Sequence, residues 1–281
     1  MPFSARLGFA WHGCCTFAAV LLASDEALDA DVRVFAEKAV VQLADGPPSR
    51  PPSRTRGRNA MTSSAGPQTG ETPTARQKRV WNTMAPGYDK QIALFEKIWF
   101  AGGREWLGRR AHGRVLEVAI GTGRNMPHYP SDTSLTGIDL SPAMLAIARR
   151  RAAALDSPVE LREGDAEHLP FDGASFDTVV CALSLCSIPD PGTAIAEMYR
   201  VLVPGGTLLL VDHIASSWQP LRAAQWLLER MTIRAGGEHF TRRQLPLVEV
   251  AGFEIAETVR LKAGTIERIL ARKPTAREAD A

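Results

Sequence analysis

Short apolar runs alternate with segments of helical periodicity from residue 114 to near the end of the chain. Residues 141–155 and 192–202 carry apolar side chains at intervals of three and four, which predicts two amphipathic helices. The apolar runs have the length of buried strands and lie at 114–120, 134–140, 159–165, 176–185, 207–214, 252–261 and 265–273. This alternation predicts an α/β fold: a doubly wound, Rossmann-like, mostly parallel sheet of seven strands with helices on both faces. Ligands of such sheets bind at the carboxyl ends of the strands, where the strand order reverses.

The segment ahead of this region has a different pattern. Residues 1–45 form a poorly defined N-terminal segment whose apolar stretch resembles a signal peptide, but His12 interrupts it and no clean cleavage site follows. A simpler interpretation is that Met61 is the biological start. Residues 46–75 are rich in Pro, Gly, Ser and Arg and cannot bury enough apolar surface to fold, which predicts a disordered linker. The natural domain is then 76–281.

Composition narrows the classes of function. The chain has 281 residues, of which 45% are hydrophobic and 23% charged, as in a globular protein. Its 33 basic and 31 acidic residues leave a net charge of +2, which argues against nucleic acid as the partner. It has no apolar run of the roughly 18 residues that a membrane-spanning helix needs. The cysteines show neither zinc-ligand spacing nor a disulfide framework, so we expect no metal and a cytoplasmic location; they are Cys14, Cys15, Cys181 and Cys186.

The end of the first strand carries the strongest local signal. Gly121 and Gly123 allow a tight turn and a close approach of backbone to ligand. A dinucleotide site would have a third glycine at position 126, where this chain has Met126. Glu117 lies inside the strand, and a buried carboxylate is costly unless a positive or hydrogen-bonding group meets it. The pattern favours a cofactor with an amino group, although Glu117 could instead cap backbone amides.

Two more acidic residues follow the next two strands. Asp139 can accept both hydroxyls of a ribose, and Ser141, as the N-cap of the following helix, would leave it free to do so. Asp165 with Ala166 suits an adenine edge, since a carboxylate accepts from the exocyclic amine while a neighbouring backbone N–H reaches a ring nitrogen. The alternatives are an ordinary helix start and an ordinary turn.

These residues carry a family resemblance. In order, VLEVAIGTGRN, LTGIDLSPAML, GDAEHLPF, FDTVVCALSLCSI and EMYRVLVPGGTLLLVDH are similar to the class I S-adenosylmethionine-dependent methyltransferases. Within them the chain most resembles the group of quinone-ring C-methyltransferases, phosphatidylethanolamine N-methyltransferases and alkyl-thiol S-methyltransferases, over about residues 78–260. Ala119 departs from the pattern, because the family usually has a glycine there.

The resemblance implies S-adenosylmethionine as the cofactor and assigns residues to its parts. Around the methionine part it places Glu117, Gly121, Thr122 and Gly123. It places the ribose against Asp139 and the adenine near Met144, Asp165 and Ala166. The remaining expected contacts come from Tyr88 over the cofactor, from Ala119 and Leu140 in the two strand-end segments, and from Ala182 on the sulfonium side.

The residues that act on the methyl acceptor are harder to identify. His213 and His239 are candidate bases, because neutral histidine can take a proton from a thiol or phenol. The alternatives are a strand-end histidine bonded to a backbone carbonyl for His213 and a loop residue for His239. Cys181 and Cys186 read as small buried hydrophobes. Trp218 and Trp226 have helical spacing and could line an acceptor pocket or pack on the core.

The sequence therefore predicts an enzyme that transfers a methyl group to a small-molecule or lipid-like acceptor: a thiol, a quinol or phenol, or a phospholipid amine. A lipid acceptor would bring peripheral membrane contact, for which the consecutive Arg149, Arg150 and Arg151 are candidates, unless they form only a solvated helix face. Two alternatives remain: an NAD-dependent oxidoreductase on a Rossmann-like sheet, and a non-catalytic cofactor-binding module. The oligomeric state is left open.

Overall fold

The computed structural model describes residues 70–100, 102–155, 158–235 and 237–275. The predictions for residues 1–45 and for most of the linker lie outside these residues. The first described helix, α3 (Pro73–Phe95), begins where the Thr72 hydroxyl accepts a hydrogen bond from the Ala75 N–H at 3.2 Å. Thr72 is thus a side-chain N-cap, and Pro73 occupies the first helical turn, where its missing N–H costs nothing.

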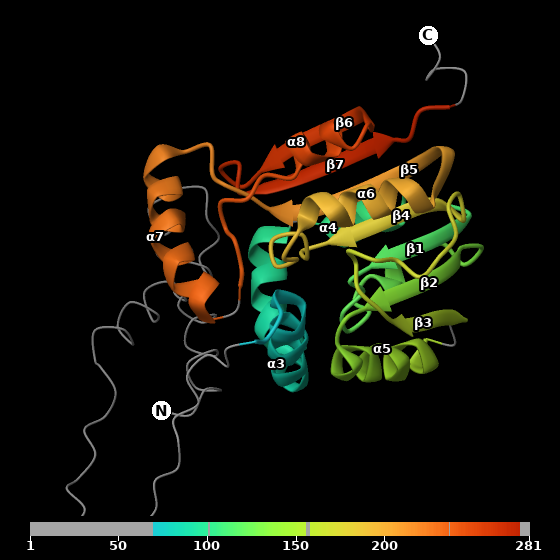
Figure 1. Cartoon of the computed structure of the whole chain (residues 1–281), viewed down its shortest axis with the longest axis horizontal. Coiled ribbons are helices and arrows are strands. Elements are labelled where there is room, and N and C mark those ends of the chain that lie inside the picture. The colour runs from blue at the N-terminus through green and yellow to red at the C-terminus, as the bar shows by residue number, and fades with distance from the viewer. Residues whose placement is uncertain (1–69, 101, 156–157, 236, 276–281) are drawn as a thin grey trace, which may run out of the picture.

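A single seven-stranded sheet organises the domain, as predicted (Figure 1). Its strands are β1 (Arg114–Val118), β2 (Ser134–Asp139), β3 (Val159–Glu163), β4 (Phe176–Ala182), β5 (Leu202–His213), β6 (Glu254–Leu261) and β7 (Ile266–Arg272). They lie in the order β3-β2-β1-β4-β5-β7-β6. The pairings among β1 to β5 are parallel, whereas β7 runs antiparallel to both β5 and β6. The strand order reverses between β1 and β4, so a ligand site is expected at the carboxyl ends of these two strands.

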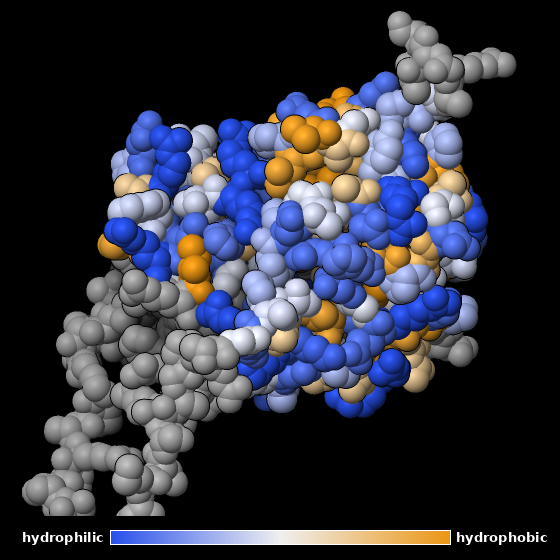
Figure 2. Space-filling model, viewed as in Figure 1, coloured by the Kyte–Doolittle hydropathy of each residue, from blue (hydrophilic) through white to orange (hydrophobic). Residues whose placement is uncertain are grey.

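Helices cover both faces of the sheet, which confirms the predicted layers. Besides α3 they are the π-helix η1 (Glu96–Phe100), α4 (Gly103–Gly108), the 3-10 helix η2 (Met126–His128), α5 (Pro142–Ala154), α6 (Pro191–Val201), α7 (Gln219–Ala235) and α8 (Leu245–Val250). Successive strand residues face opposite sides, so Leu116 packs in the cluster with α6 and α8 while Val115 packs in the cluster with α4 and α5. Both side chains are completely buried. The face of the molecule shown in Figure 2 is mostly hydrophilic, with separate hydrophobic areas.

Two connections differ from a strict alternation of strands and helices. Only η2 lies between β1 and β2, and no helix lies between β3 and β4. The fifth strand is longer than the expected 207–214, because β5 begins at Leu202 and includes the VPGG segment, residues 203–206. The pairing of β5 with β4 shifts register between Phe176 and Thr178, and Gly205 adopts a φ of +78°. The VPGG residues therefore form an irregularity within the strand.

Candidate functional site

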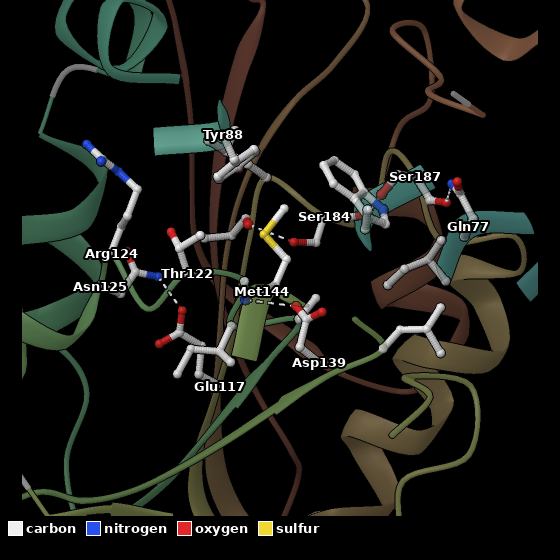
Figure 3. Close-up of a pocket in the computed structure, with 18 of the residues that line it drawn as sticks. Gln77, Tyr88, Glu117, Thr122, Arg124, Asn125, Asp139, Met144, Ser184 and Ser187 are labelled. Carbon is white, nitrogen blue, oxygen red and sulfur yellow. Dashed lines mark hydrogen bonds between the residues drawn. The ribbon is translucent and has the colours of Figure 1, made fainter. Parts of the chain in front are cut away.

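A cavity of about 830 Å³, measured out to its open mouth, lies at the reversal of strand order. All the predicted cofactor residues line it except Gly123 and Ala166: they are Tyr88, Glu117, Ala119, Gly121, Thr122, Asp139, Leu140, Met144, Asp165 and Ala182. Gly123 lies behind the wall, because a Cβ there would stand 2.5 Å from the Met126 side chain. Ala166 packs instead against the core cluster of α6. The cavity therefore gathers side chains from four strand ends and from α3. Figure 3 shows Glu117, Asp139 and Tyr88 among them.

The glycine loop after β1 forms part of the cavity wall. Gly121 has a φ of +59°, and a Cβ built on it would meet nothing within 4 Å, so its backbone borders open space. Ala119 also has a positive φ, +55°, a conformation that costs a residue with a Cβ about 1 kcal/mol. The glycine that the family usually has at this position would avoid that cost.

Thr122 fixes the glycine loop to α3 and α5. Its hydroxyl donates to the Asp89 carboxylate at 2.6 Å, and Arg151 donates to the Thr122 carbonyl at 2.6 Å and to Asp89 at 2.5 Å. Arg151 thus has a local structural role, whereas Arg149 and Arg150 are exposed.

Glu117 lines the cavity with only 2% of its surface exposed. One carboxylate oxygen accepts from the Asn125 amide at 2.7 Å and the other from the Tyr129 hydroxyl at 2.9 Å. Its partners are therefore side chains rather than the backbone amides of the alternative interpretation. Burial raises the pKa of Glu117 to about 7, although both hydrogen bonds and the nearby Arg104 favour the carboxylate. A cation in the cavity would favour it further.

Asp139 is not free, in contrast to the expectation. Its two oxygens accept the backbone N–H groups of Gly121 and Ser141, each at 2.8 Å. Ser141 does cap α5, since its hydroxyl accepts from the Met144 N–H at 3.1 Å, but its own N–H also binds Asp139. Each carboxylate oxygen keeps a second acceptor site, so ribose hydroxyls can still bind. Burial raises the pKa of Asp139 to about 6.

Several residues of the wall gave no signal in the sequence. Arg104 and Arg124 both pair with Glu96 of η1 and both line the cavity. Two buried polar atoms of the wall, Arg104 Nε and Gln77 Oε1, have no hydrogen-bond partner among the described residues. A ligand with a carboxylate and hydrogen-bond donors would suit them. The other residues missed are Thr74, Trp81, Ile120, Asn125, Leu183, Ser184, Ser187, Ile188 and Pro189.

The geometry disfavours a dinucleotide. A pyrophosphate normally binds at the N-terminus of the helix that follows the glycine turn. Here the turn leads only to η2, a single 3-10 turn, and the Met126 side chain packs against Gly123. The loop thus offers no helix N-terminus of useful length to a pyrophosphate.

The two candidate bases lie outside the lining of this cavity. His213, the last residue of β5, stacks on Phe240 with ring centroids 4.8 Å apart, and its Nδ1 is buried without a partner among the described residues. His239 lies 3.4 Å from the Glu229 carboxylate, and its backbone N–H donates to the Cys186 carbonyl at 2.9 Å. Burial lowers the pKa of both histidines.

Trp226 of α7 and Trp218, which immediately precedes α7, neither line the cavity nor pack on the core. Trp218 is 47% exposed and Trp226 is 54% exposed. The two cysteines within the described residues, Cys181 and Cys186, are free and buried, as small hydrophobic residues would be.

The fold and the cavity define a class of protein: an α/β domain with a cavity at the acidic carboxyl ends of its parallel strands. A family model described as a methyltransferase domain matches residues 116–210. The phosphatidylethanolamine N-methyltransferase of Cereibacter sphaeroides is 42% identical over 120 residues, which are 42% of this chain and 59% of that protein. The demethylmenaquinone methyltransferase of Deinococcus radiodurans is 35% identical over 167 residues, 54% of this chain and 67% of that protein.

A solved structure shows the same fold. The crystal structure of a SAM-dependent methyltransferase from Thermotoga maritima has a TM-score of 0.55 at 22% identity and covers 70% of this chain and 99% of its own. The chain therefore belongs to the class I S-adenosylmethionine-dependent methyltransferases, as its resemblance implied. The match spans less than two thirds of the Cereibacter protein, 59% of its length. Among the described residues, no helix has both the length and the apolar character to cross a membrane.

Proposed function

We propose that this protein transfers a methyl group from S-adenosylmethionine to a small or lipid-like acceptor that carries a thiol, a quinol or phenol ring, or a phospholipid amine. The observation that carries this proposal is the convergence of Glu117, Asp139 and Asp165 on one cavity at the reversal of strand order. The acceptor range is supported by the relatives, whose names specify a phospholipid amine and a quinone.

The residues present fit the cofactor. The buried Glu117 carboxylate would hold the ammonium of the methionine part, while Arg104 and Arg124 would hold its carboxylate. Asp139 would bind the ribose hydroxyls through its remaining acceptor sites, and Asp165 the adenine amine. Bound S-adenosylmethionine supplies an electrophilic methyl group on a sulfonium, an excellent leaving group. The chain itself has to hold the acceptor in line with that methyl group and exclude water.

The experiment is an assay of labelled methyl transfer with three acceptors: an alkyl thiol, a short-chain quinol and phosphatidylethanolamine vesicles. Binding of S-adenosylhomocysteine is measured in parallel by calorimetry, and binding of NADH by fluorescence. We expect transfer to at least one acceptor and binding of S-adenosylhomocysteine. Cofactor binding without any transfer would favour a binding module, and NADH binding without S-adenosylhomocysteine binding would favour an oxidoreductase.

We further propose peripheral membrane contact through α7, with the protein in the cytoplasm. The helix exposes Trp226 and, at 60%, Leu227, and Trp218 is exposed immediately ahead of the first helical residue. Arg222 is exposed, and the Arg230 guanidinium lies 4.4 Å from the centre of the Trp226 ring. Tryptophan and leucine beside arginine are typical of helices that lie in the interface of anionic membranes.

Vesicle co-sedimentation tests this contact. The double variant Trp226→Ala, Leu227→Ala should sediment less than wild type with vesicles that contain anionic lipid. Val250→Ser is the matched control, because Val250 is 87% exposed on α8. Equal sedimentation of the double variant and wild type would exclude α7 as the contact.

A further inference from the structure

Glu238 is a buried acid that the cofactor site does not use. It follows α7 and is 8% exposed. Its backbone carbonyl accepts from the Thr232 hydroxyl at 3.2 Å. Among the described residues, the charge that acts on its carboxylate is the like charge of the buried Asp212. A carboxyl group buried beside a like charge is costly, so its retention there points to a chemical role.

The chain around Glu238 holds it in a defined place. Gly237 ends α7 with a φ of +76°, and its N–H donates to the Thr232 and Ile233 carbonyls, which turns the chain back toward the sheet. The next residue, His239, donates its N–H to the Cys186 carbonyl. Arg242 donates to the carbonyls of Leu185 at 2.7 Å and Ile188 at 2.6 Å. The loop is thereby fastened to the segment after β4.

The same segment borders the cofactor cavity. Ser187 lines the cavity, and its carbonyl accepts from the Gln77 amide (Figure 3). Gly237 lies directly against this Gln77, since a Cβ on Gly237 would stand 3.0 Å from Gln77 Nε2. The charge of Glu238 also acts on Tyr88, which lines the cavity from α3. Glu238 therefore lies beside the cavity, on the side of Gln77 and Tyr88.

The ionisable groups around Glu238 come from three elements: Asp212 on β5, Tyr88 on α3 and Cys186 after β4. Asp212 is already engaged, because its oxygens accept from the His213 N–H at 2.8 Å and the Cys186 N–H at 3.2 Å. Burial raises the pKa of Tyr88 and of Cys186. Neither of these two groups can then supply a negative charge near neutral pH.

Basicity separates Glu238 from the two histidines. Burial lowers the pKa of His213 and His239, which makes each a weaker proton acceptor than ordinary histidine. Burial, together with the charge of Asp212, raises the pKa of Glu238 to about 8. A carboxylate with a pKa near the working pH is suited to general base catalysis.

We propose that Glu238 is the general base of the reaction: it takes the proton from a methyl acceptor whose attacking group is protonated when free, as a thiol, a phenol and a primary amine are. This inference rests on the proposed methyl transfer. The acceptor atom forms a bond to the methyl carbon while the bond from that carbon to the sulfonium breaks, and the electron pair of that bond returns to sulfur. The acceptor's proton passes to a Glu238 oxygen and from there to solvent.

The test compares wild type with Glu238→Gln, Glu238→Asp and Glu249→Gln, the last being the same change at an exposed site on α8. Rates are measured from pH 6 to 10 with each acceptor of the assay above that wild type methylates. Because general bases contribute about 10²- to 10⁴-fold, kcat of Glu238→Gln should fall at least 100-fold at pH 7.5. Its KM for S-adenosylmethionine should stay within about twofold. Glu238→Asp should recover part of the rate.

The pH profile distinguishes a base from a structural residue. The rate of wild type should increase up to about pH 8 and then level off. The rate of Glu238→Gln should not show this increase and should rise only at the pH where the acceptor itself ionises. A Glu238→Gln variant with the wild-type profile and rate would overturn the proposal while leaving methyl transfer intact. A wild type that methylates none of the acceptors would instead refute the proposed function, and with it the role of Glu238.

Discussion

Replacing Glu117 with glutamine should move cofactor affinity and the stability of the unliganded protein in opposite directions. Glutamine has nearly the same shape but cannot carry the charge that Glu117 would offer to an ammonium group. Hydrogen bonds to charged groups contribute about 1.5–3 kcal/mol, so we expect the Kd for S-adenosylhomocysteine to rise by about 10- to 150-fold.

The effect on stability follows from the pKa. Glu117 has an ordinary pKa of 4.5 and a folded-state pKa of about 7, so the folded chain binds its proton more tightly than the unfolded chain does. The stability from this group is fully present below pH 4.5 and is lost as the pH rises through 7. At about 1.4 kcal/mol per pH unit, the loss amounts to about 3 kcal/mol. The glutamine variant has no carboxyl group at this position, so it does not undergo this loss of stability as the pH rises.

The assay is urea unfolding without ligand at pH 5 and pH 8.5, with calorimetry of S-adenosylhomocysteine binding at pH 8. The unfolding free energy of Glu117→Gln relative to wild type should increase by about 3 kcal/mol between the two pH values. Glu254→Gln, at an exposed position of β6, should show no such change. If Glu117→Gln bound the ligand as wild type does, Glu117 would not contact the cofactor. If its relative stability were independent of pH, the reasoning about burial would be refuted.

Three further predictions concern the same cavity. Asp139→Ala leaves the Gly121 and Ser141 N–H groups without their acceptor, so it should lower the unfolding free energy by about 1–3 kcal/mol and raise the Kd for S-adenosylhomocysteine at least tenfold; unchanged affinity would remove Asp139 from the site. Gly121→Ala places a methyl group in the open space of the cavity at a φ of +59°, so cofactor affinity should fall while circular dichroism stays that of wild type; unaltered affinity would mean that the cofactor lies elsewhere. Between pH 7 and pH 6 the Kd of wild type should rise by up to about fivefold as Glu117 takes up a proton, and a flat calorimetric profile would contradict this.

The acidic strand ends could be predicted from the sequence because their position follows from chain direction. Glu117, Asp139 and Asp165 lie in or just after apolar runs, and parallel strands bring their carboxyl ends to one edge of the sheet. Alternation of apolar runs and amphipathic helices was likewise enough to predict the layers. The sequence pattern did not predict that Asp139 accepts a hydrogen bond from the Gly121 N–H. This N–H reaches the Asp139 carboxylate only in the folded glycine loop.

Which residues outside the strand ends line the cavity depends on tertiary packing, and no local sequence pattern encodes that packing. Arg104 reaches the cavity from a short helix that begins after Gly102, whose φ is +74°. Gln77 lies on α3, ahead of the sheet, and contacts Ser187 more than a hundred residues later. Glu238 was missed although the adjacent His239 was selected, because only the fold shows that Glu238 is buried beside another acid, Asp212.

The buried acids give a way to separate the cofactor side of the molecule from the acceptor side. Glu117, Asp139 and Glu238 all have pKa values raised by burial, so without ligand the stability should fall steadily as the pH rises from about 5 to 9. In the proposed cofactor site, the ammonium and hydroxyl groups of S-adenosylhomocysteine would bind the charged forms of Glu117 and Asp139, so its stabilising effect should grow with pH and offset the fall below pH 7. The fall through pH 8 belongs to Glu238 and should persist with saturating ligand in wild type but vanish in Glu238→Gln. Unfolding curves with and without ligand that stay parallel across this range would contradict the division into two sides.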